Sequence, residues 1–218
     1  MRAALAALFV VAGAAAAEPT LAPAGPLCVT LGKLVARDGQ QHVESDKMRA
    51  VTAAPRPPSA ELRFTYLGPT ATTSALASGA VRRQIGLKLL AADGCNLLYV
   101  MWRLDPQPGL VVSLKRNPGQ HLSLECGNRG YRNVTPRRSA PLPSVAVGVP
   151  HRLAAALVDG ELTVQADGAP VWSGPVPPET AQLSGPVGIR SDNGRFALDL
   201  RAPPAAAAAA PCPRGEAD

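Results

Sequence analysis

The chain has 218 residues, with 22 Lys and Arg against 16 Asp and Glu, four cysteines, 23 prolines and only 4% aromatic residues. This length suffices for one domain with a sizeable hydrophobic core. Because 46% of the residues are apolar and 17% are charged, the composition excludes a wholly disordered chain. Many of the apolar residues are alanines, so we expect a core built mainly from Leu and Val.

The first residues have the pattern of an export signal. Arg2 precedes an uncharged apolar run from Ala3 to Ala14, and three alanines stand before Glu18. We therefore predict a signal peptide over residues 1–17 and a secreted or periplasmic protein. The apolar run is too short for a membrane-spanning helix, which needs about 20 residues. The bias toward Ala, Arg and Pro is associated with bacterial proteins.

Proline and alanine clusters divide the rest of the chain. We expect a Pro/Ala leader over 18–27, one β-sandwich domain over 28–202 and a disordered Ala/Pro tail over 203–218. Positive charge is concentrated in residues 81–138, where ten Lys and Arg stand against three acidic residues. Such a segment can attract an anionic polymer, although it is more often a solvated surface. Nucleic acid is disfavoured as a partner, because the protein is exported and the segment lacks interleaved aromatic rings.

The folded region has the pattern of β-strands throughout. Apolar and polar residues alternate in 62–66 and again in 196–200, as in half-buried strands. Asp-Gly pairs at 159–160 and 167–168 predict two hairpins with type I′ turns. With no convincing helix, this pattern predicts an all-β antiparallel sandwich or barrel. Further strands are expected over 84–90, 97–104, 110–115 and 122–125.

Three segments resemble a known superfamily. HRLAAALVDGELTVQADGAPVW and GPVGIRSDNGRFALDL resemble the C-terminal half of concanavalin A-like lectins and glucanases, including laminin-G-like domains and the 3-keto-disaccharide hydrolase group. CNLLYVMWRLDPQPGLVVSLKR is similar to their central strand pair. The resemblance covers about residues 60–201. It implies a jelly roll of two curved sheets, often with a glycan on the concave face, but a fold alone does not settle function.

The catalytic motif of the glucanases is incomplete. Those enzymes carry paired carboxylates on one strand, spaced E-x-D-x-E or E-x-D-x-x-E, so that both point into the groove. Glu44 and Asp46 begin such a motif, but Met48 and Arg49 stand where the second glutamate would be. We therefore expect no hydrolysis by that route and identify no catalytic residues.

Metal binding has little support in the sequence. His42, His121 and His151 are scattered, without HxH or HExxH spacing. Asp192 and Asn193 could offer oxygens to Ca²⁺, as in some lectins, but in front of a glycine they are first a turn signal. We expect no cofactor, with calcium at Asp192 and Asn193 as the weaker alternative.

Alternation in the strand expected over 97–104 defines a candidate ligand surface. Its even-numbered apolar residues, Leu98 and Trp102 among them, should face the core. Tyr99 and Arg103 then face the other way. Few other rings could serve as a stacking platform: besides Tyr99, these are Tyr131 and Trp172.

Simple hairpins after this strand would extend the surface. They place Lys115 and His121 beside Tyr99, and Glu125 beside Arg103. Sugars are recognised by such a combination, because the CH face of a pyranose stacks on an aromatic ring while its hydroxyls take charged hydrogen bonds. The alternative is an ordinary solvated face on which Arg103 and Glu125 merely pair. The candidate ligand-binding residues are Tyr99, Arg103, Lys115, His121 and Glu125.

Four cysteines in an exported chain suggest two disulfides, with three possible pairings. The jelly roll implied by the resemblance brings the termini together, which favours Cys28 with Cys212 and leaves Cys95 with Cys126. The hairpin register instead separates Cys95 from Cys126 by roughly 30 Å, at about 3.3 Å per residue, whereas a disulfide needs Cα atoms within about 7 Å. One of these two expectations must be wrong, and a disulfide between Cys28 and either Cys95 or Cys126 stays possible.

These features together predict an exported module that binds a polysaccharide, an oligosaccharide or another envelope polymer, with an anionic glycan as one option. A glycan-active enzyme of the 3-keto-disaccharide hydrolase type is the first alternative. A structural or protein-interaction domain of the cell envelope is the second.

Overall fold

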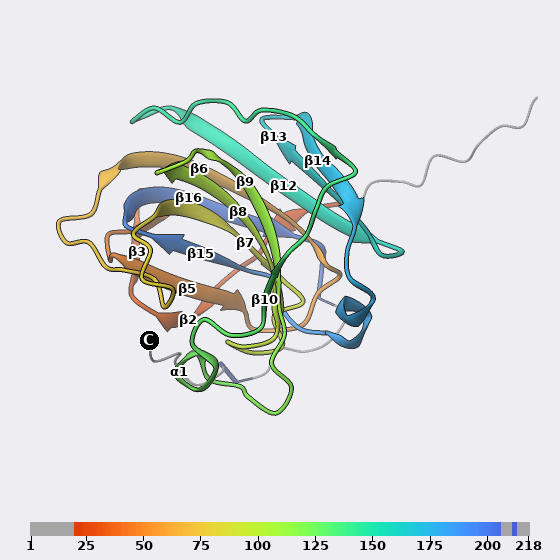
Figure 1. Cartoon of the computed structure of the whole chain (residues 1–218). Coiled ribbons are helices and arrows are strands. Elements are labelled where there is room, and N and C mark those ends of the chain that lie inside the picture. Colours follow the sequence, from red (N-terminus) through yellow and green to blue (C-terminus); the bar gives the residue numbers. More distant parts are fainter. Residues whose placement is uncertain (1–19, 206–210, 213–218) are drawn as a thin grey trace, which may run out of the picture.

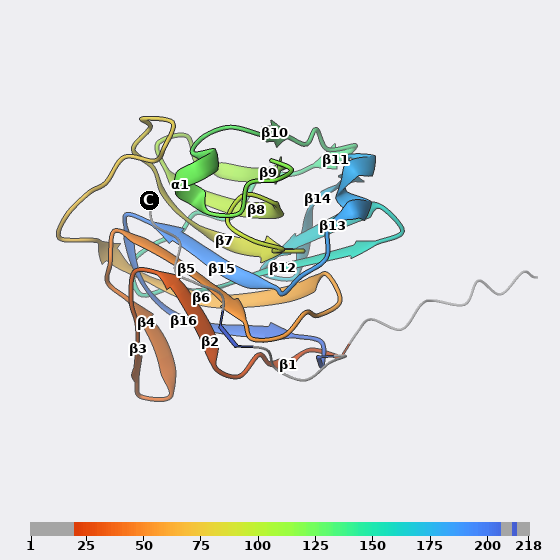
Figure 2. The ribbon, with the colours of Figure 1, turned by 90° about the horizontal axis from the view of Figure 1, so that it is seen from below.

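The computed structural model describes residues 20–205 and 211–212. The predicted signal peptide and most of the predicted tail lie outside these residues. The described part is a sandwich of two curved antiparallel sheets (Figures 1 and 2), which confirms the predicted all-β jelly roll. None of its helices is long and apolar enough to cross a membrane.

Sixteen strands and two short helices make up the described chain. In chain order they are β1 (Ala22–Pro23), β2 (Leu27–Leu31), β3 (Leu34–Arg37), β4 (Gln40–Val43), β5 (Lys47–Thr52), β6 (Ser59–Pro69), β7 (Arg83–Leu89), β8 (Leu97–Asp105), β9 (Gly109–Lys115), α1 (Ser123–Cys126), β10 (Tyr131–Asn133), β11 (Arg138–Ser139), β12 (Pro150–Val158), β13 (Glu161–Ala166), β14 (Ala169–Pro175), the 3₁₀ helix η1 (Pro178–Gln182), β15 (Gly188–Asp192) and β16 (Gly194–Ala202).

The two sheets are built from different sets of these strands. The nine-stranded sheet has the order β11-β14-β13-β12-β6-β16-β4-β3, with β1 paired to β16. The seven-stranded sheet has the order β10-β9-β8-β7-β15-β5-β2. Chain neighbours β7 to β10 are therefore also spatial neighbours, whereas β15 and β5 reach the same sheet from distant parts of the sequence.

The core lies between the sheets and contains the even-numbered residues of β8, as predicted. Leu98 and Val100 are fully buried there, and Trp102 is 1% exposed. The Phe64 ring on β6 meets the Trp102 ring edge-on at 5.5 Å and the Phe196 ring at 6.0 Å. Burying one such side chain contributes roughly 1.5–3 kcal/mol, and the contact between Phe64 and Trp102 joins the two sheets.

The two predicted Asp-Gly hairpins are confirmed. Asp159 and Gly160 have φ values of 49° and 77°, and they join β12 to β13. Asp167 and Gly168 have φ values of 51° and 86°, and they join β13 to β14. A type I′ turn needs φ > 0 at both central residues, which Asp and Gly tolerate better than other residues.

The strand predicted over 122–125 is wrong, because this segment forms α1. One carboxylate oxygen of Glu125 accepts the backbone N–H groups of His121 at 2.8 Å and Leu122 at 3.0 Å, which closes a helical turn. Leu122 is 42% exposed and Leu124 is 69% exposed, so neither reaches the core. The chain leaves the sheet after β9, and β10 takes the edge position instead.

The pairing of β8 with β9 differs by two residues from the predicted register. Tyr99 lies opposite Ser113 and not Lys115, and Arg103 lies opposite Gly109. Because side chains alternate with a period of two, this even shift leaves Tyr99, Arg103 and Lys115 on one face.

The disulfides are Cys28–Cys212 and Cys95–Cys126, with Cα separations of 5.3 and 6.0 Å. The pairing implied by the resemblance is therefore correct, and the hairpin register that opposed it is wrong. Once the chain turns into α1, Cys126 returns to the start of β8 and meets Cys95.

We expect the Cys28→Ser, Cys212→Ser variant to lose about 4–5 kcal/mol of unfolding free energy, since its crosslink closes a sequence separation of 184 residues. The Cys95→Ser, Cys126→Ser variant opens a separation of only 31 residues, and its loss should be about 1.5 kcal/mol smaller. Urea denaturation without reductant measures both values. Both estimates assume that a crosslink stabilises the fold by restricting the unfolded chain. A larger loss for the second variant would contradict this assumption.

Candidate functional site

The seven-stranded sheet is hollowed on the face turned away from the core. A cavity of about 260 Å³, here named the groove, lies over β5, β15 and β7 to β10. The segment between β6 and β7 and the chain around α1 also line it. Of the five predicted ligand residues, Tyr99, Arg103 and Lys115 line the groove.

The register of the strands brings separate parts of the sequence into rows across the groove. Arg49 pairs with Arg190 between β5 and β15, and Arg190 pairs in turn with Gly86 on β7. In the next row, Asp192 pairs with Gln84, and Gln84 pairs with Arg103. Because both rows lie two residues apart along their strands, their side chains share the outer face.

A buried carboxylate organises the floor of the groove. Asp192 is fully buried and accepts hydrogen bonds from Arg49 at 2.8 Å, Arg190 at 2.9 Å and Gln84 at 2.7 Å. Arg49 also donates to the carbonyl oxygens of Met48 and of the residue before Asp192, each at 2.9 Å. Breaking one partner out of such a buried pair typically costs about 3–5 kcal/mol, because the other charge is left uncompensated.

The ionisation of this network follows from its geometry. Burial alone would raise the pKa of Asp192, but Arg190, Arg49 and the hydrogen bond from Gln84 outweigh it and lower this pKa to about 2. Burial alone would also lower the pKa of Arg190, but the Asp192 carboxylate and the nearby tyrosines hold it well above its ordinary value. Both side chains are therefore charged at neutral pH.

Two tyrosine rings stand above this network. The Tyr99 and Tyr131 rings stack at 6.0 Å between centroids, with 17° between their planes. The Arg190 guanidinium lies 5.0 Å from the Tyr99 centroid and donates to the Tyr131 hydroxyl at 3.2 Å. Tyr99 is 3% exposed and Tyr131 is 37% exposed. The ring that the groove presents to a ligand is therefore Tyr131, with Tyr99 as its support.

Lys115, the last residue of β9, also contacts the Tyr131 ring. Its ammonium group is buried, donates to the Gly94 carbonyl oxygen at 3.0 Å and lies 5.2 Å from the Tyr131 centroid. Burial raises the pKa of the Tyr131 phenol, Tyr99 adds to this rise, and the nearby cations oppose it. Tyr131 is thus held as a neutral phenol against two cations.

Polar side chains continue the groove beside this ring. Ser113 on β9 donates its hydroxyl to the side-chain oxygen of Asn133 at 2.9 Å. Asn133 is exposed and its side-chain amide supplies further donors. On the opposite side, a Cβ added to Gly86 would lie 2.1 Å from the Val100 carbonyl oxygen, so no side chain fits there. The Met101 sulfur would lie 2.9 Å from the same Cβ, so the Met101 side chain covers Gly86 and lines the groove there.

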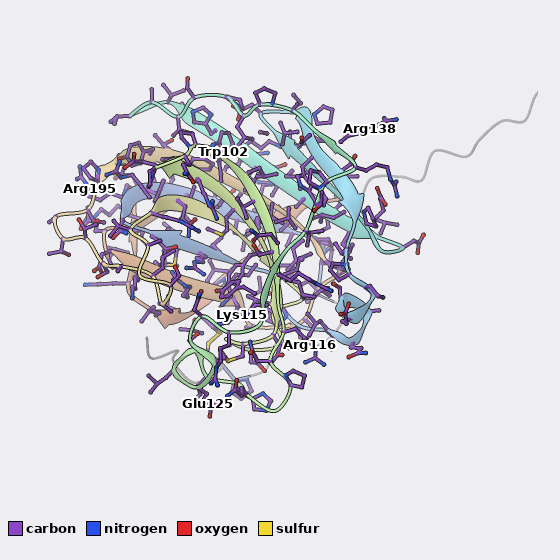
Figure 3. All side chains as sticks on the ribbon, in the orientation of Figure 1. Trp102, Lys115, Arg116, Glu125, Arg138 and Arg195 are labelled. Atoms are coloured by element: carbon purple, nitrogen blue, oxygen red, sulfur yellow. A yellow bond between two sulfur atoms is a disulfide. The ribbon has the colours of Figure 1, made fainter. Side chains whose placement is uncertain are left out.

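His121 and Glu125 lie outside the groove, in contrast to the predicted grouping with Tyr99 and Arg103. His121 faces solvent and contacts Asp93 at 2.8 Å. The Glu125 carboxylate accepts hydrogen bonds from backbone N–H groups, and these bonds lower its pKa. Figure 3 shows Glu125 at the outer end of the α1 segment, beyond Lys115.

Asp192 and Asn193, the weaker candidates for a calcium site, have other partners. Both carboxylate oxygens of Asp192 accept hydrogen bonds from guanidinium or amide groups, as described above, and the guanidinium charges repel a cation. Asn193 accepts the Ser74 N–H at 2.8 Å and donates to the carbonyl oxygens of Ser74 and Arg82, each at 2.9 Å. It therefore anchors the segment that forms one wall of the groove.

Sequence reasoning missed Arg49, Gln84, Arg190 and Asp192 as members of the site. Arg49 and Arg190 are buried in β5 and β15, and a buried charge needs a partner, but the sequences KMRAVT and GIRSD are too polar to mark either arginine as buried. Which acidic residue pairs with these arginines depends on which strands lie side by side in the sheet. Trp172 is 4% exposed and belongs to the core, so it is not a platform for a ligand.

The comparisons with known proteins identify the fold. No family model matches the sequence, and no curated protein sequence matches it. The carbohydrate-binding module CBM66 from Bacillus subtilis is similar in structure, with a TM-score of 0.54 and 10% identity over 79% of this chain and 91% of that chain.

Two further structures share the architecture. The Emp46p carbohydrate recognition domain has a TM-score of 0.51 and 13% identity over 80% of this chain and 87% of that chain. A protein of unknown function with a galectin-like fold from Bacillus subtilis has a TM-score of 0.51 and 13% identity over 81% of this chain and 87% of that chain. The protein therefore has the jelly-roll fold that these structures share.

The Asp192→Asn variant tests the network under the groove. We expect it to be less stable than the parent at pH 6 by about 3–5 kcal/mol, because Arg49 and Arg190 lose their shared counter-charge. The pKa of Asp192 is lowered by folding, so its contribution is complete above pH ~4 and declines as the pH falls toward about 2.

The difference between the two proteins should accordingly shrink by about 2 kcal/mol between pH 4 and pH 2. Urea unfolding at a series of pH values measures it. Since other carboxylates titrate in both proteins, the difference isolates Asp192. A difference that stays constant over this range would show that folding does not lower the pKa of Asp192.

Proposed function

We propose that the protein is an exported carbohydrate-binding module of the concanavalin A-like type, and that it holds an oligosaccharide in the groove. The observation that carries the proposal is the partly exposed Tyr131 ring, fixed by Tyr99 and Arg190 and flanked by polar side chains. A pyranose presents a CH face that suits such a ring, and its hydroxyls suit the donors beside it.

Several features support the choice of a binding module. The groove is already shaped by buried contacts, so little ordering is needed when a ligand enters. The Asp192 carboxylate beneath it is engaged by three side chains and serves as a counter-ion. Two of the structures that share this fold are named as a carbohydrate-binding module and a carbohydrate recognition domain.

Export is supported by two features of the chain. Arg2 and the apolar run after it have the pattern of a signal peptide. Both cysteine pairs form disulfides, which persist in oxidising compartments such as the periplasm or the cell exterior. We propose that the mature protein works there on a glycan or another polymer of the envelope.

A glycan array followed by calorimetry tests the proposed binding. We expect Tyr131→Ala to weaken the best ligand by about 30-fold, or about 2 kcal/mol, because it removes the stacking surface. Tyr131→Phe keeps the ring and should stay within about three-fold of the parent.

His121→Ala is the matched control, since it removes an exposed ring outside the groove and should leave affinity unchanged. If a folded parent protein binds no neutral or acidic glycan, the proposal is wrong and a protein-interaction role gains support. Product formation from an oligosaccharide would instead favour an enzyme.

A further inference from the structure

The two ends of the groove differ in chemistry. Tyr131 and Asn133 lie at one end, where a sugar ring has a surface to stack on and donors beside it. Arg103 lies at the other end, four residues along β8 from Tyr99, which is roughly 13 Å at about 3.3 Å per residue. Arg82, from the segment before β7, lines the groove at the Arg103 end. The groove is long enough to hold more than one sugar ring, with an arginine pair at its far end.

These two arginines differ from most others in the described chain. Arg49 and Arg190 pair with Asp192, and the nearest acid along β8, Asp105, lies 3.5 Å from Arg83. No hydrogen bond or ion pair joins the guanidinium of Arg103 or Arg82 to another described residue. The Nε atom of Arg103 is buried without a hydrogen-bond partner.

The electrostatic setting makes this end of the groove a place for an anion. Burial lowers the pKa of Arg103, and the like charge of Arg82 lowers it further. Two neighbouring guanidinium groups without a counter-ion repel each other, and an anionic oxygen group between them would relieve that repulsion. Lys115, Arg49 and Arg190 also line the groove, so its cations outnumber the one carboxylate beneath it.

The backbone that carries the arginine pair is held in position by contacts within the protein. Asn193 donates to the Arg82 carbonyl oxygen at 2.9 Å and fixes the same wall through Ser74. Arg103 lies on β8, which is paired on both sides, opposite Gln84 on β7 and Gly109 on β9. A guanidinium presents a rigid fork of donors that matches the two oxygens of a carboxylate or of a sulfate ester.

We propose that Arg82 and Arg103 bind the carboxylate or sulfate group of an acidic oligosaccharide whose neighbouring sugar lies against Tyr131. This rests on the proposed carbohydrate-binding function and names the class of glycan. It also gives part of the positive charge between residues 81 and 138 a specific role, because both arginines belong to that segment.

The test uses calorimetry with pairs of glycans that differ only in charge. Oligogalacturonate is compared with its methyl ester, and dextran sulfate with dextran. The parent should bind at least one anionic member about ten-fold or more tightly than its neutral counterpart. Which pair shows the preference identifies the group as a carboxylate or a sulfate.

Arg82→Gln and Arg103→Gln should each weaken that binding by about ten-fold or more, in line with the loss of a charged hydrogen bond. Arg138→Gln removes the same charge at a distant exposed position (Figure 3) and should change affinity by less than about two-fold. Arg103→Lys keeps the charge without the fork and should fall between the parent and Arg103→Gln. Thermal unfolding of each variant shows that it is folded.

An equal loss from Arg138→Gln would mean non-specific attraction to a cationic surface and would overturn the inference. Binding of neutral and anionic members alike, lost in Tyr131→Ala but kept in both arginine variants, would overturn it while leaving the proposed function intact. Failure of every glycan to bind the folded parent would overturn both.

Discussion

The site depends on one buried ion-pair network. The Asp192 carboxylate accepts hydrogen bonds from Arg49, Arg190 and Gln84, which lie on three different strands. Arg190 in turn contacts the Tyr99 ring and donates to the Tyr131 hydroxyl. Without the carboxylate, two guanidinium charges would be buried together on the outer face of the sheet. The network therefore joins β5, β15 and β7 through their side chains and holds Arg190, which donates a hydrogen bond to the Tyr131 hydroxyl.

Placing this network outside the main core has a structural consequence. The space between the sheets is filled mainly by Trp102, Phe64 and their apolar neighbours, with the buried His151 ring against both aromatic rings. The buried charges of the network lie instead on the outer face of the seven-stranded sheet, where each is paired with an opposite charge. Among the described arginines that line the groove, the half-buried Arg103 and Arg82 are the exceptions, and they lie at the end away from Tyr131.

Much of the fold could be predicted from sequence because its signals are local. Alternation in β8 correctly separates Trp102 from Tyr99 and Arg103, and an error of two residues in pairing does not disturb this, since the strand period is two. The Asp-Gly turns are equally local. The turn at α1 is not predictable in this way, because the side chain of Glu125 bonds to the backbone and overrides an apolar pattern that resembles a strand.

The centre of the site escapes prediction for a different reason. Arg49 and Asp192 are separated by 143 positions in the sequence, and they meet because β5 pairs with β15. Tyr131 can be named as one of few rings, but its role depends on β10 replacing the expected strand beside β9. Long-range topology, more than residue type, decides which side chains form the groove.

The most direct test of a carbohydrate site in the groove is a crystal structure of the protein with the oligosaccharide that it binds most tightly. The proposed function predicts a sugar ring against Tyr131 inside the groove of the seven-stranded sheet. A glycan bound on the nine-stranded sheet, or elsewhere with the groove unoccupied, would contradict it.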